Sequence, residues 1–501
     1  MRDQVDLVVI GGGVNGAGIA RDAAGRGLSV LLCEKGDLAE GTSSRSGKLV
    51  HGGLRYLEYY EFRLVREALI EREVLLNAAP HIIWPMRFVL PHSPQDRPAW
   101  LVRLGLFLYD HLGGRMTLPG TRDLDLRQAP EGRPLKADYT RAFEYSDCWV
   151  DDARLVTLNA LDAAERGAEV LTRTACVSAR REEGGFRVEL ADQTTGARRV
   201  VRAKALVNAS GPWVNDVLGR VVGANSQRGV RLVKGSHIIT PKFWDGPQAY
   251  LVQNHDKRVI FINPYEGDLA LIGTTDIPFS GRPEDVEADE GEINYLIDAV
   301  NRYFKAPLKR TDVLRTFSGV RPLFDDGKGN PSAVTRDYVF DLDETGGAPA
   351  LSVFGGKITT YRKLSEHAMQ RLAKFFPDMK GDWTSSAPLP GGDLPSADFF
   401  AFLRDLQRER PWLPTDLADH YARLYGSRTR EILGGARALA DLGRRFGPRL
   451  YEAEVRYLQD KEWARTAEDI VERRTKHGIR MTSEEKAALA DWLEAARLTA
   501  A

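Results

Sequence analysis

Basic and hydroxyl side chains alternate with glycines between residues 41 and 60, in the sequence GTSSRSGKLVHGGLRYLEYY. Small hydroxyls in this segment stand beside Arg45, Lys48, His51 and Arg55. The segment is too polar and too rich in glycine for a helix, and it suits a loop that wraps around a polyanionic or heteroaromatic ligand. A solvated basic loop without a ligand fits the same composition equally well.

A glycine turn near the N-terminus is the second chemical signal. Residues 5–18 read VDLVVIGGGVNGAG, an apolar strand that breaks at Gly11, Gly13 and Gly16 in the spacing GxGxxG. Such a turn lets the backbone approach a pyrophosphate and starts a helix whose N-terminus faces it. Glu34 ends the next predicted strand, where an acid can accept hydrogen bonds from an adenosine ribose. The pattern predicts a dinucleotide site, with NAD and FAD both open; a βαβ unit without a ligand is the alternative.

The chain is predicted to return twice to the edge of the sheet that carries this turn. Residues 205–207 form a short apolar strand followed by NASGPW, and residues 351–360 read LSVFGGKITT. In both, a strand ends in small residues and so brings backbone amides to the carboxyl edge of the sheet, where ligands bind in such folds. Lys357 directly follows the two glycines of the second return. The alternative there is a glycine turn beside a solvent-exposed lysine.

The remaining patterns position these segments. We expect helices over residues 61–79, 151–167, 416–425, 429–442, 452–460 and 484–499, from their apolar periodicity, caps and glycine or proline stops. Two inserted regions, residues 81–149 and 236–330, are expected to form a second domain that covers the substrate. Residues 395–496 show helical patterns with no glycine motif or nucleophile arrangement, so we expect a structural or interaction module there.

Composition excludes several classes of protein. At 501 residues the chain is too long for one core and predicts about two or three domains. Lysine plus arginine and aspartate plus glutamate both number 70, so no net charge favours nucleic acid. The three cysteines show no CxxC pair and no metal spacing with histidine, so we expect reduced thiols and no metal site. With no room for a signal peptide and no apolar stretch of ~18–20 residues, we expect a cytoplasmic protein.

The ordered motifs resemble one family. GGGVNGAG, TSSRSGKLVHGGLRYLE, FEYSDCWVDDARL, GPWV, KGSH, IGTTD, SGVRPL, TRDY and GGKITTYRKL follow one another as in the FAD-dependent, aerobic and quinone-linked glycerol-3-phosphate dehydrogenases. The resemblance covers about residues 1–390 closely and the remainder more loosely. It implies a mixed α/β fold with a glutathione-reductase-like FAD-binding domain, an antiparallel-sheet substrate domain and a C-terminal helical domain.

The resemblance also implies domain boundaries and a cofactor site. The expected FAD-binding domain comprises residues 1–80, 150–235 and 331–380, the substrate domain 81–149 and 236–330, the linker 381–394 and the helical domain 395–501. The positions that match the family's FAD site are Gly11, Gly13, Asn15, Gly16, Glu34, Thr42, Ser43, Ser44, Lys48, His51, Gly52, Val177, Ser210, Gly211, Gly356, Lys357 and Thr359. The resemblance therefore selects FAD over NAD.

The implied reaction is oxidation of glycerol 3-phosphate to dihydroxyacetone phosphate, which needs phosphate anchors, a base and a group that polarises the reacting oxygen. Arg321 and Arg336 match the family's phosphate positions, and a guanidinium binds phosphate oxygens in pairs. Tyr56, Thr274, Arg55 and Lys357 match positions around the substrate and the flavin ring. His51 is the candidate base, with Arg55 and Lys357 as rival proton acceptors, or it only hydrogen-bonds the cofactor.

The family passes its electrons to membrane quinone. Residues 98–112, PAWLVRLGLFLYDHL, carry aromatic and apolar side chains with basic flanks, which suits peripheral binding to the inner face of the cytoplasmic membrane. A helix packed inside the second domain fits the same residues. A homodimer is expected from the resemblance. The alternatives are an oxidase that reduces O2 to H2O2, disfavoured because no extra inserted block is visible, and a flavin-binding subunit without activity.

Overall fold

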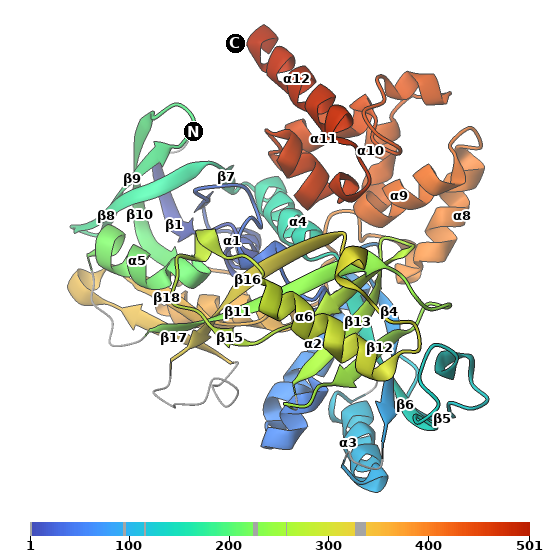
Figure 1. Cartoon of the computed structure of the whole chain (residues 1–501). Helices are drawn as coiled ribbons and strands as arrows, with labels where there is room; N and C mark the ends of the chain where they lie inside the picture. The colour runs from blue at the N-terminus through green and yellow to red at the C-terminus, as the bar shows by residue number, and fades with distance from the viewer. Residues whose placement is uncertain are drawn as a thin grey trace.

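The computed structural model describes residues 3–93, 97–114, 117–223, 229–256, 258–325 and 337–500, of which residues 497–500 as backbone alone. Two sheets and a separate group of C-terminal helices make up the molecule (Figure 1). The mixed α/β class and the three expected kinds of unit are confirmed. Within the described residues, no helix is long and apolar enough to cross a membrane.

The first sheet brings together strands from distant parts of the chain in the order β17-β18-β10-β1-β2-β7, with β9 paired to β10 and β8 to β9. Their bounds are β1 Gln4–Ile10, β2 Val30–Cys33, β7 Glu169–Leu171, β8 Thr174–Glu182, β9 Gly185–Asp192, β10 Arg198–Asn208, β17 Tyr338–Asp343 and β18 Ala350–Gly355. Strand β1 runs parallel to β2 and β10, and β10 parallel to β18. The carboxyl ends of β1, β10 and β18 therefore lie at one edge, as the two predicted returns require.

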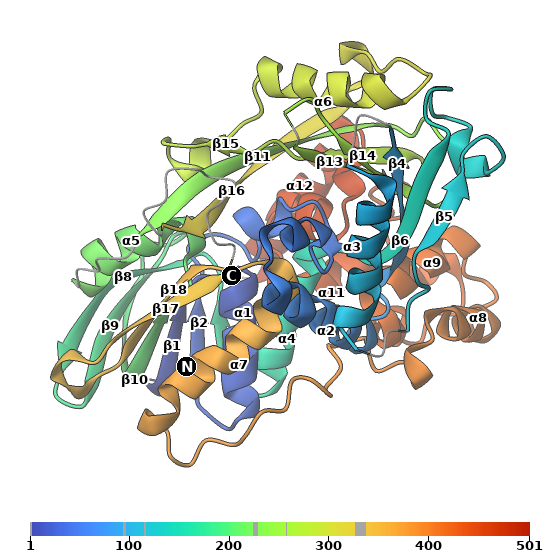
Figure 2. The same cartoon turned by 90° about the horizontal axis from the view of Figure 1, so that it is seen from below.

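Three helices cover this sheet with small and apolar side chains. They are α1 Val14–Gly25, α4 Asp152–Glu165 and α7 Tyr361–Leu372, and α1 packs between the other two (Figure 2). Alanines at positions 17, 20 and 23 of α1 are completely buried, which lets the helices approach closely. The Asp151 carboxylate accepts the Arg154 amide and so caps α4, as predicted.

The second sheet has the order β15-β11-β14-β13-β12-β4-β6-β3, with β16 paired to β11 and β5 to β6. Its strands are β3 Leu49–Val50, β4 Ile83–His92, β5 Arg122–Asp125, β6 Arg141–Val150, β11 Val230–Pro241, β12 Ala249–Gln253, β13 Val259–Tyr265, β14 Leu269–Gly273, β15 Ile277–Pro278 and β16 Arg315–Phe324. Every pair is antiparallel except β4 with β12. Helix α6, Glu290–Tyr303, covers one face, and α2 Phe62–Ala78 and α3 Ala99–Leu112 lie on the opposite side (Figure 2).

Some residues lie across the expected domain boundaries. Strand β3, within the expected FAD-binding segment 1–80, pairs with β6 of the second sheet, and β11 begins before residue 236. The expected linker is itself packed against α1 and against the end of the helix Phe62–Ala78. Trp383 donates its indole N–H to the Asp22 carbonyl at 3.1 Å, and the Leu389 amide donates to the Ala78 carbonyl at 2.9 Å. The boundaries themselves stay a prediction.

The C-terminal domain has its own apolar core. Its helices are α8 Phe399–Glu409, α9 Thr415–Tyr425, α10 Thr429–Leu433, α11 Glu452–Glu462 and α12 Ser483–Ala500. The helix predicted over residues 429–442 was wrong, because α10 stops at Leu433, where Gly434 adopts a φ of +46°. Buried ion pairs join this domain to the loop after β2 and to α4: Arg474 pairs with Asp37 at 2.7 Å, and Glu462 pairs with Arg154.

Candidate active site

The turn after β1 is built so that only glycine fits. Gly11 has a φ of +112°, and a Cβ there would lie 2.7 Å from the Ala209 carbonyl oxygen, on the loop that follows β10. A Cβ on Gly16 would lie 1.8 Å from the Gly11 carbonyl oxygen. Helix α1 therefore starts directly against the turn, and its first turn carries no acidic residue. This arrangement leaves the helix N-terminus favourable for an anion.

Glu34 lies at the end of β2 beside the same turn. Its carboxylate accepts the Gly12 amide at 2.6 Å and the Gly36 amide at 2.8 Å. Burial raises the pKa of Glu34, although both amide hydrogen bonds act to lower it. The structure thus places the acid where a ribose of a dinucleotide would lie, at the carboxyl end of the second strand.

The basic loop of residues 42–60 folds into short 3₁₀ turns around β3 and contacts both sheets. Thr42 donates its hydroxyl to the Val320 carbonyl of β16 at 2.5 Å, and the Ser43 hydroxyl accepts the Val14 amide of α1 at 3.0 Å. Lys48 is buried and pairs with Asp152 at 2.7 Å, so its charge serves an internal ion pair. The loop therefore connects the glycine turn with the second sheet.

The second return, residues 351–360, meets the glycine turn at Asn15. The Asn15 amide group donates to the Gly355 carbonyl at 3.3 Å, and its Oδ1 is buried without a hydrogen-bond partner among the residues that the structure describes. Gly355 and Gly356 have φ values of +81° and +99°. The backbone amide of His51 donates to the Thr359 hydroxyl at 3.2 Å. The basic loop, the glycine turn and the second return therefore converge at one edge.

Lys357 and Arg321 lie on neighbouring segments beside this convergence. The Lys357 ammonium group stands 5.0 Å from the centre of the Tyr56 ring. Gly355 lies against β16, since a Cβ on it would be 3.7 Å from the Pro322 carbonyl oxygen. Arg321, the residue before Pro322, is half-buried. The segments that carry Lys357 and Arg321 therefore lie next to each other.

A buried polar network holds the strand end next to Arg321. Arg321 donates from Nη2 to the Thr275 carbonyl at 2.9 Å and to Asp276 at 3.1 Å. The Thr275 hydroxyl donates to Glu292 of α6 at 2.7 Å, and the Ser236 hydroxyl donates to the same carboxylate oxygen at 2.8 Å. Lys234 pairs with the other Glu292 oxygen at 2.6 Å. Glu292, which sequence reasoning did not single out, is therefore the centre of the network.

His237 is a second residue that sequence reasoning did not assign, although KGSH was among the family motifs. Its ring stacks on Phe317 with centroids 4.8 Å apart, and it is buried against Gly273. Burial, with Lys48 and Arg321 nearby, lowers the pKa of His237 to about 3. The ring is therefore neutral at physiological pH, and it is better suited to packing than to proton transfer.

The other predicted site residues are each described by their own contacts. The Ser210 hydroxyl donates to Asn208 at 2.6 Å, and Gly211 has a φ of +58°. Val177 is exposed on β8 at a break in the pairing with β9. The Gly52 amide donates to Asp147 at 3.3 Å. The remaining positions are Arg55 and Tyr56 in the second 3₁₀ turn, Ser44, whose carbonyl accepts from Lys48, Thr274 at the end of β14, and Arg336, which lies outside the described residues.

Comparisons with known proteins agree with this geometry. Residues 6–362 match the family described as FAD dependent oxidoreductase, and residues 383–497 match the C-terminal domain of alpha-glycerophosphate oxidase. The chain belongs to the FAD-dependent glycerol-3-phosphate dehydrogenase family. It is 70% identical to the D-erythritol 1-phosphate dehydrogenase of Brucella abortus, over 99% of both chains. It is 53% identical to the aerobic glycerol-3-phosphate dehydrogenase of Escherichia coli, over 97% of both chains.

A solved structure shows the same fold with its cofactor. The glycerol-3-phosphate dehydrogenase from Bacillus halodurans complexed with FAD is 27% identical, has a TM-score of 0.76, and aligns over 98% of this chain and 94% of that one. FAD is therefore the cofactor of this family member, and the prediction of FAD is confirmed. The residues present fit it: the glycine turn leaves no side chain in the way, and the buried Asn15 Oδ1 provides an acceptor beside it.

Proposed function

We propose that the protein oxidises a secondary hydroxyl of a short polyol phosphate, with D-erythritol 1-phosphate as its preferred substrate. The observation that carries this choice is the 70% identity to a D-erythritol 1-phosphate dehydrogenase over nearly the whole of both chains, against 53% to the glycerol-3-phosphate dehydrogenase of Escherichia coli. Glycerol 3-phosphate, expected from the sequence, is the second candidate. Both substrates share a phosphate and an adjacent polyol, so the same cationic side chains, Arg321 and Lys357, are proposed to serve either.

The proposed reaction assigns roles to residues at the edge. Bound FAD supplies the acceptor for the hydride that leaves the substrate carbon. Arg321, with Arg336 as its proposed partner, binds the phosphate through paired N–H donors. His51 removes the hydroxyl proton, and Lys357 stabilises negative charge on the reacting oxygen. Arg55 and Lys357 remain the rival proton acceptors, and Tyr56 and Thr274 border the substrate.

The remaining cofactor positions keep their proposed roles beside FAD. Those proposed for the pyrophosphate and adenosine are the glycine turn with Asn15, Glu34, Val177, Ser210 and Gly211. Those proposed for the flavin ring are Thr42, Ser43, Ser44, Lys48, Gly52, Gly356 and Thr359. Because Lys48 already pairs with Asp152, its contact with the flavin is proposed to come from the backbone.

The electrons are proposed to pass to quinone at a membrane surface. Helix α3 supports this, because it buries Leu106 and Tyr109 but exposes Trp100, Leu104 and Phe107, whose residue surfaces are 69%, 47% and 53% accessible. An exposed aromatic and apolar helix face suits the interface of a bilayer. Peripheral binding at the inner face of the cytoplasmic membrane and a homodimer complete the proposal. An oxidase that uses O2 is the alternative.

An anaerobic titration tests the substrate. Purified holoenzyme is mixed with D-erythritol 1-phosphate or with glycerol 3-phosphate, and the loss of the visible flavin band is followed in time. We expect both to bleach the flavin, with a higher kcat/KM for D-erythritol 1-phosphate. A preference for glycerol 3-phosphate overturns the first choice, and no bleaching by either overturns the class of substrate.

A second experiment tests the acceptor and the membrane surface. Quinone reduction is measured against H2O2 formation in air, and stoichiometric peroxide would contradict a quinone acceptor. Co-sedimentation with anionic vesicles is compared for the native chain and for the variant Trp100→Ser with Phe107→Ser. We expect the variant to lose vesicle binding while flavin bleaching by substrate stays unchanged. Equal sedimentation of both proteins would remove α3 from the membrane contact.

A further inference from the structure

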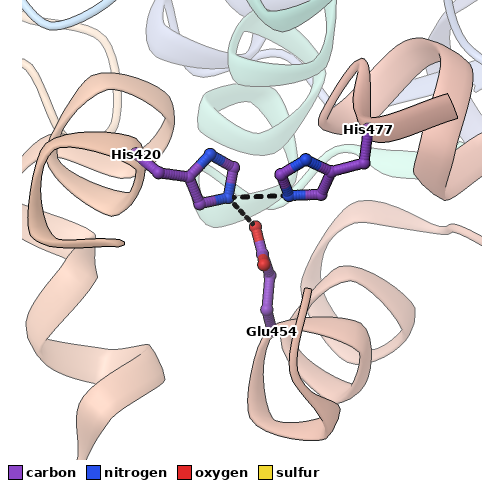
Figure 3. A group of neighbouring side chains, drawn as sticks. All are labelled: His420, Glu454 and His477. Atoms are coloured by element: carbon purple, nitrogen blue, oxygen red, sulfur yellow. Dashed lines mark hydrogen bonds and ion pairs between the residues drawn. The ribbon is translucent and has the colours of Figure 1, made fainter. Parts of the chain in front are cut away.

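Three ligand-forming side chains converge inside the C-terminal helical domain, far from the FAD-binding edge along the chain. Figure 3 shows His420 of α9, Glu454 of α11 and His477, which begins the 3₁₀ turn His477–Ile479, pointing toward one another. His420 Nε2 lies 2.9 Å from Glu454 Oε1 and 3.2 Å from His477 Nε2. All three ligand atoms lie within 4.8 Å of one another, and all three residues are buried.

The spacing matches a metal's first coordination shell. Imidazole nitrogens and carboxylate oxygens bind zinc at about 2.0–2.2 Å, which separates neighbouring ligands of a tetrahedral site by about 3.3 Å. The distances of 2.9 and 3.2 Å lie near that value, and the third pair of ligand atoms lies within 4.8 Å. The side chains come from three different segments, so their approach is imposed by the packing of the domain. Two histidines with one carboxylate are the protein ligands of known zinc sites in which water takes the fourth position.

The burial of the Glu454 carboxyl group is the second observation. It is completely buried, and among the described residues its only ion-pair partner is His420. The Tyr425 hydroxyl donates to Oε1 at 2.6 Å, whereas Oε2 is buried and has no hydrogen-bond partner in the described part of the chain. A buried carboxylate that lacks a compensating cation is costly. A divalent cation between Glu454 and the imidazoles would balance that charge.

The number of histidine N–H donors also favours a metal ion at this position. His420 Nε2 faces an acceptor, Glu454 Oε1, and also the Nε2 of His477. One N–H can make only one of these contacts well, because it is a single donor. Replacing that proton with a metal ion would let both nitrogens and the carboxylate oxygen act as ligands at once. Tyr425 would then support the carboxylate from outside, as groups behind metal ligands commonly do.

We propose that His420, Glu454 and His477 form a structural Zn²⁺ site, with water completing the coordination. The site would connect α9 and α11 to the segment that ends at His477. That segment also carries Arg473 and Arg474, which pair with Asp37 in the loop after β2 at 2.6 and 2.7 Å. Lys476, next to His477, pairs with Asp151 at the start of α4. Zinc therefore fixes the contact between the helical domain and the FAD-binding region.

Elemental analysis of the holoenzyme tests the site. The protein is produced without a polyhistidine tag, with zinc in the medium, and is dialysed without chelator. We expect about one zinc per chain. Glu454→Gln and His477→Asn are expected to weaken zinc binding at least about tenfold. His255→Asn, at an exposed histidine outside the cluster, is the matched control and should keep its zinc.

Two measurements on the native chain keep the test decisive if a variant fails to fold. X-ray absorption at the zinc edge should show a first shell of nitrogen and oxygen with imidazole scattering. Removing zinc with a chelator should lower the Tm, and adding Zn²⁺ should restore it, with FAD content followed in parallel. Zinc-free protein that takes up none when Zn²⁺ is supplied, with an unchanged Tm, would leave a hydrogen-bonded cluster only and overturn the site.

Discussion

The edge with the glycine turn, where FAD is proposed to bind, and the second sheet, where the substrate is proposed to bind, are built by different means. At the edge, Gly11 and Gly16 bring backbone so close to backbone that a Cβ at either has no room. On the sheet, Arg321 is held through Thr275 by the buried carboxylate of Glu292. The first arrangement depends on the absence of side chains and the second on their presence. Adding side-chain atoms at the edge should therefore disrupt FAD binding. Removing side-chain atoms from the sheet should disrupt substrate binding.

Gly16→Ala should have the largest effect of any change at the edge. The added Cβ would lie 1.8 Å from the Gly11 carbonyl oxygen, a backbone atom that cannot move without opening the turn. We expect purified protein to contain almost no FAD, measured as the ratio of flavin to protein absorbance, and to have no activity. Gly105→Ala is the matched control, since nothing lies within 4 Å of a Cβ there. Full flavin content in Gly16→Ala would show that the turn does not hold the pyrophosphate.

His51→Asn tests the chemistry between the two regions. A positioned base contributes about 10²–10⁴-fold to rate, so kcat should fall by that range while FAD stays bound. Lys357→Met serves as the comparison. If kcat falls by that range in Lys357→Met and stays unchanged in His51→Asn, the lysine is the proton acceptor and the histidine only positions the loop.

Arg321→Met should weaken substrate binding at the second sheet and leave FAD binding at the edge unchanged. Loss of a charged phosphate contact is expected to raise KM about a hundredfold, or ~2.8 kcal/mol, with native flavin content. Arg310→Met, at an exposed arginine paired with Glu290, is the control and should leave KM unchanged. Steady-state kinetics with either polyol phosphate provides the measurement. An unchanged KM would remove Arg321 from the phosphate site.

The same contrast explains what the sequence could predict. The glycine turn, Glu34 and the Gly355–Gly356 turn were predictable because each site is a short run of residues next to a strand. Glu292 was not, because a glutamate near the start of an amphipathic helix also matches a capping box, and it does take part in one with Asp289.

The C-terminal domain shows most clearly what could not be predicted from the sequence. His420, Glu454 and His477 are separated by 34 and 23 positions, so no spacing rule predicts that they meet, and we predicted no metal site. The helix expected over residues 429–442 failed for a local reason, since apolar periodicity continued past Gly434, where the backbone turns. Contacts that depend on three packed segments appear only once the fold is known.

Glu292→Gln should have the smallest effect of these variants, and it tests whether the buried network influences Arg321. The amide keeps the volume of the side chain but loses the charge opposite Lys234 and offers one acceptor oxygen in place of two. We expect the Tm to fall, because a buried ion pair is broken, and KM to rise about tenfold, or ~1.4 kcal/mol, as the Thr275 carbonyl that orients Arg321 shifts.

The control for Glu292→Gln lies on the same helix. Glu290→Gln removes an exposed carboxylate that pairs only with Arg310 among the described residues, and it should change neither Tm nor KM. Flavin content should be native in both variants, since neither side chain contacts the edge. A lower Tm with an unchanged KM in Glu292→Gln would make the network a stabilising element without influence on Arg321. A rise in KM with native flavin would instead show that the sheet, unlike the edge, transmits its effect through buried side chains.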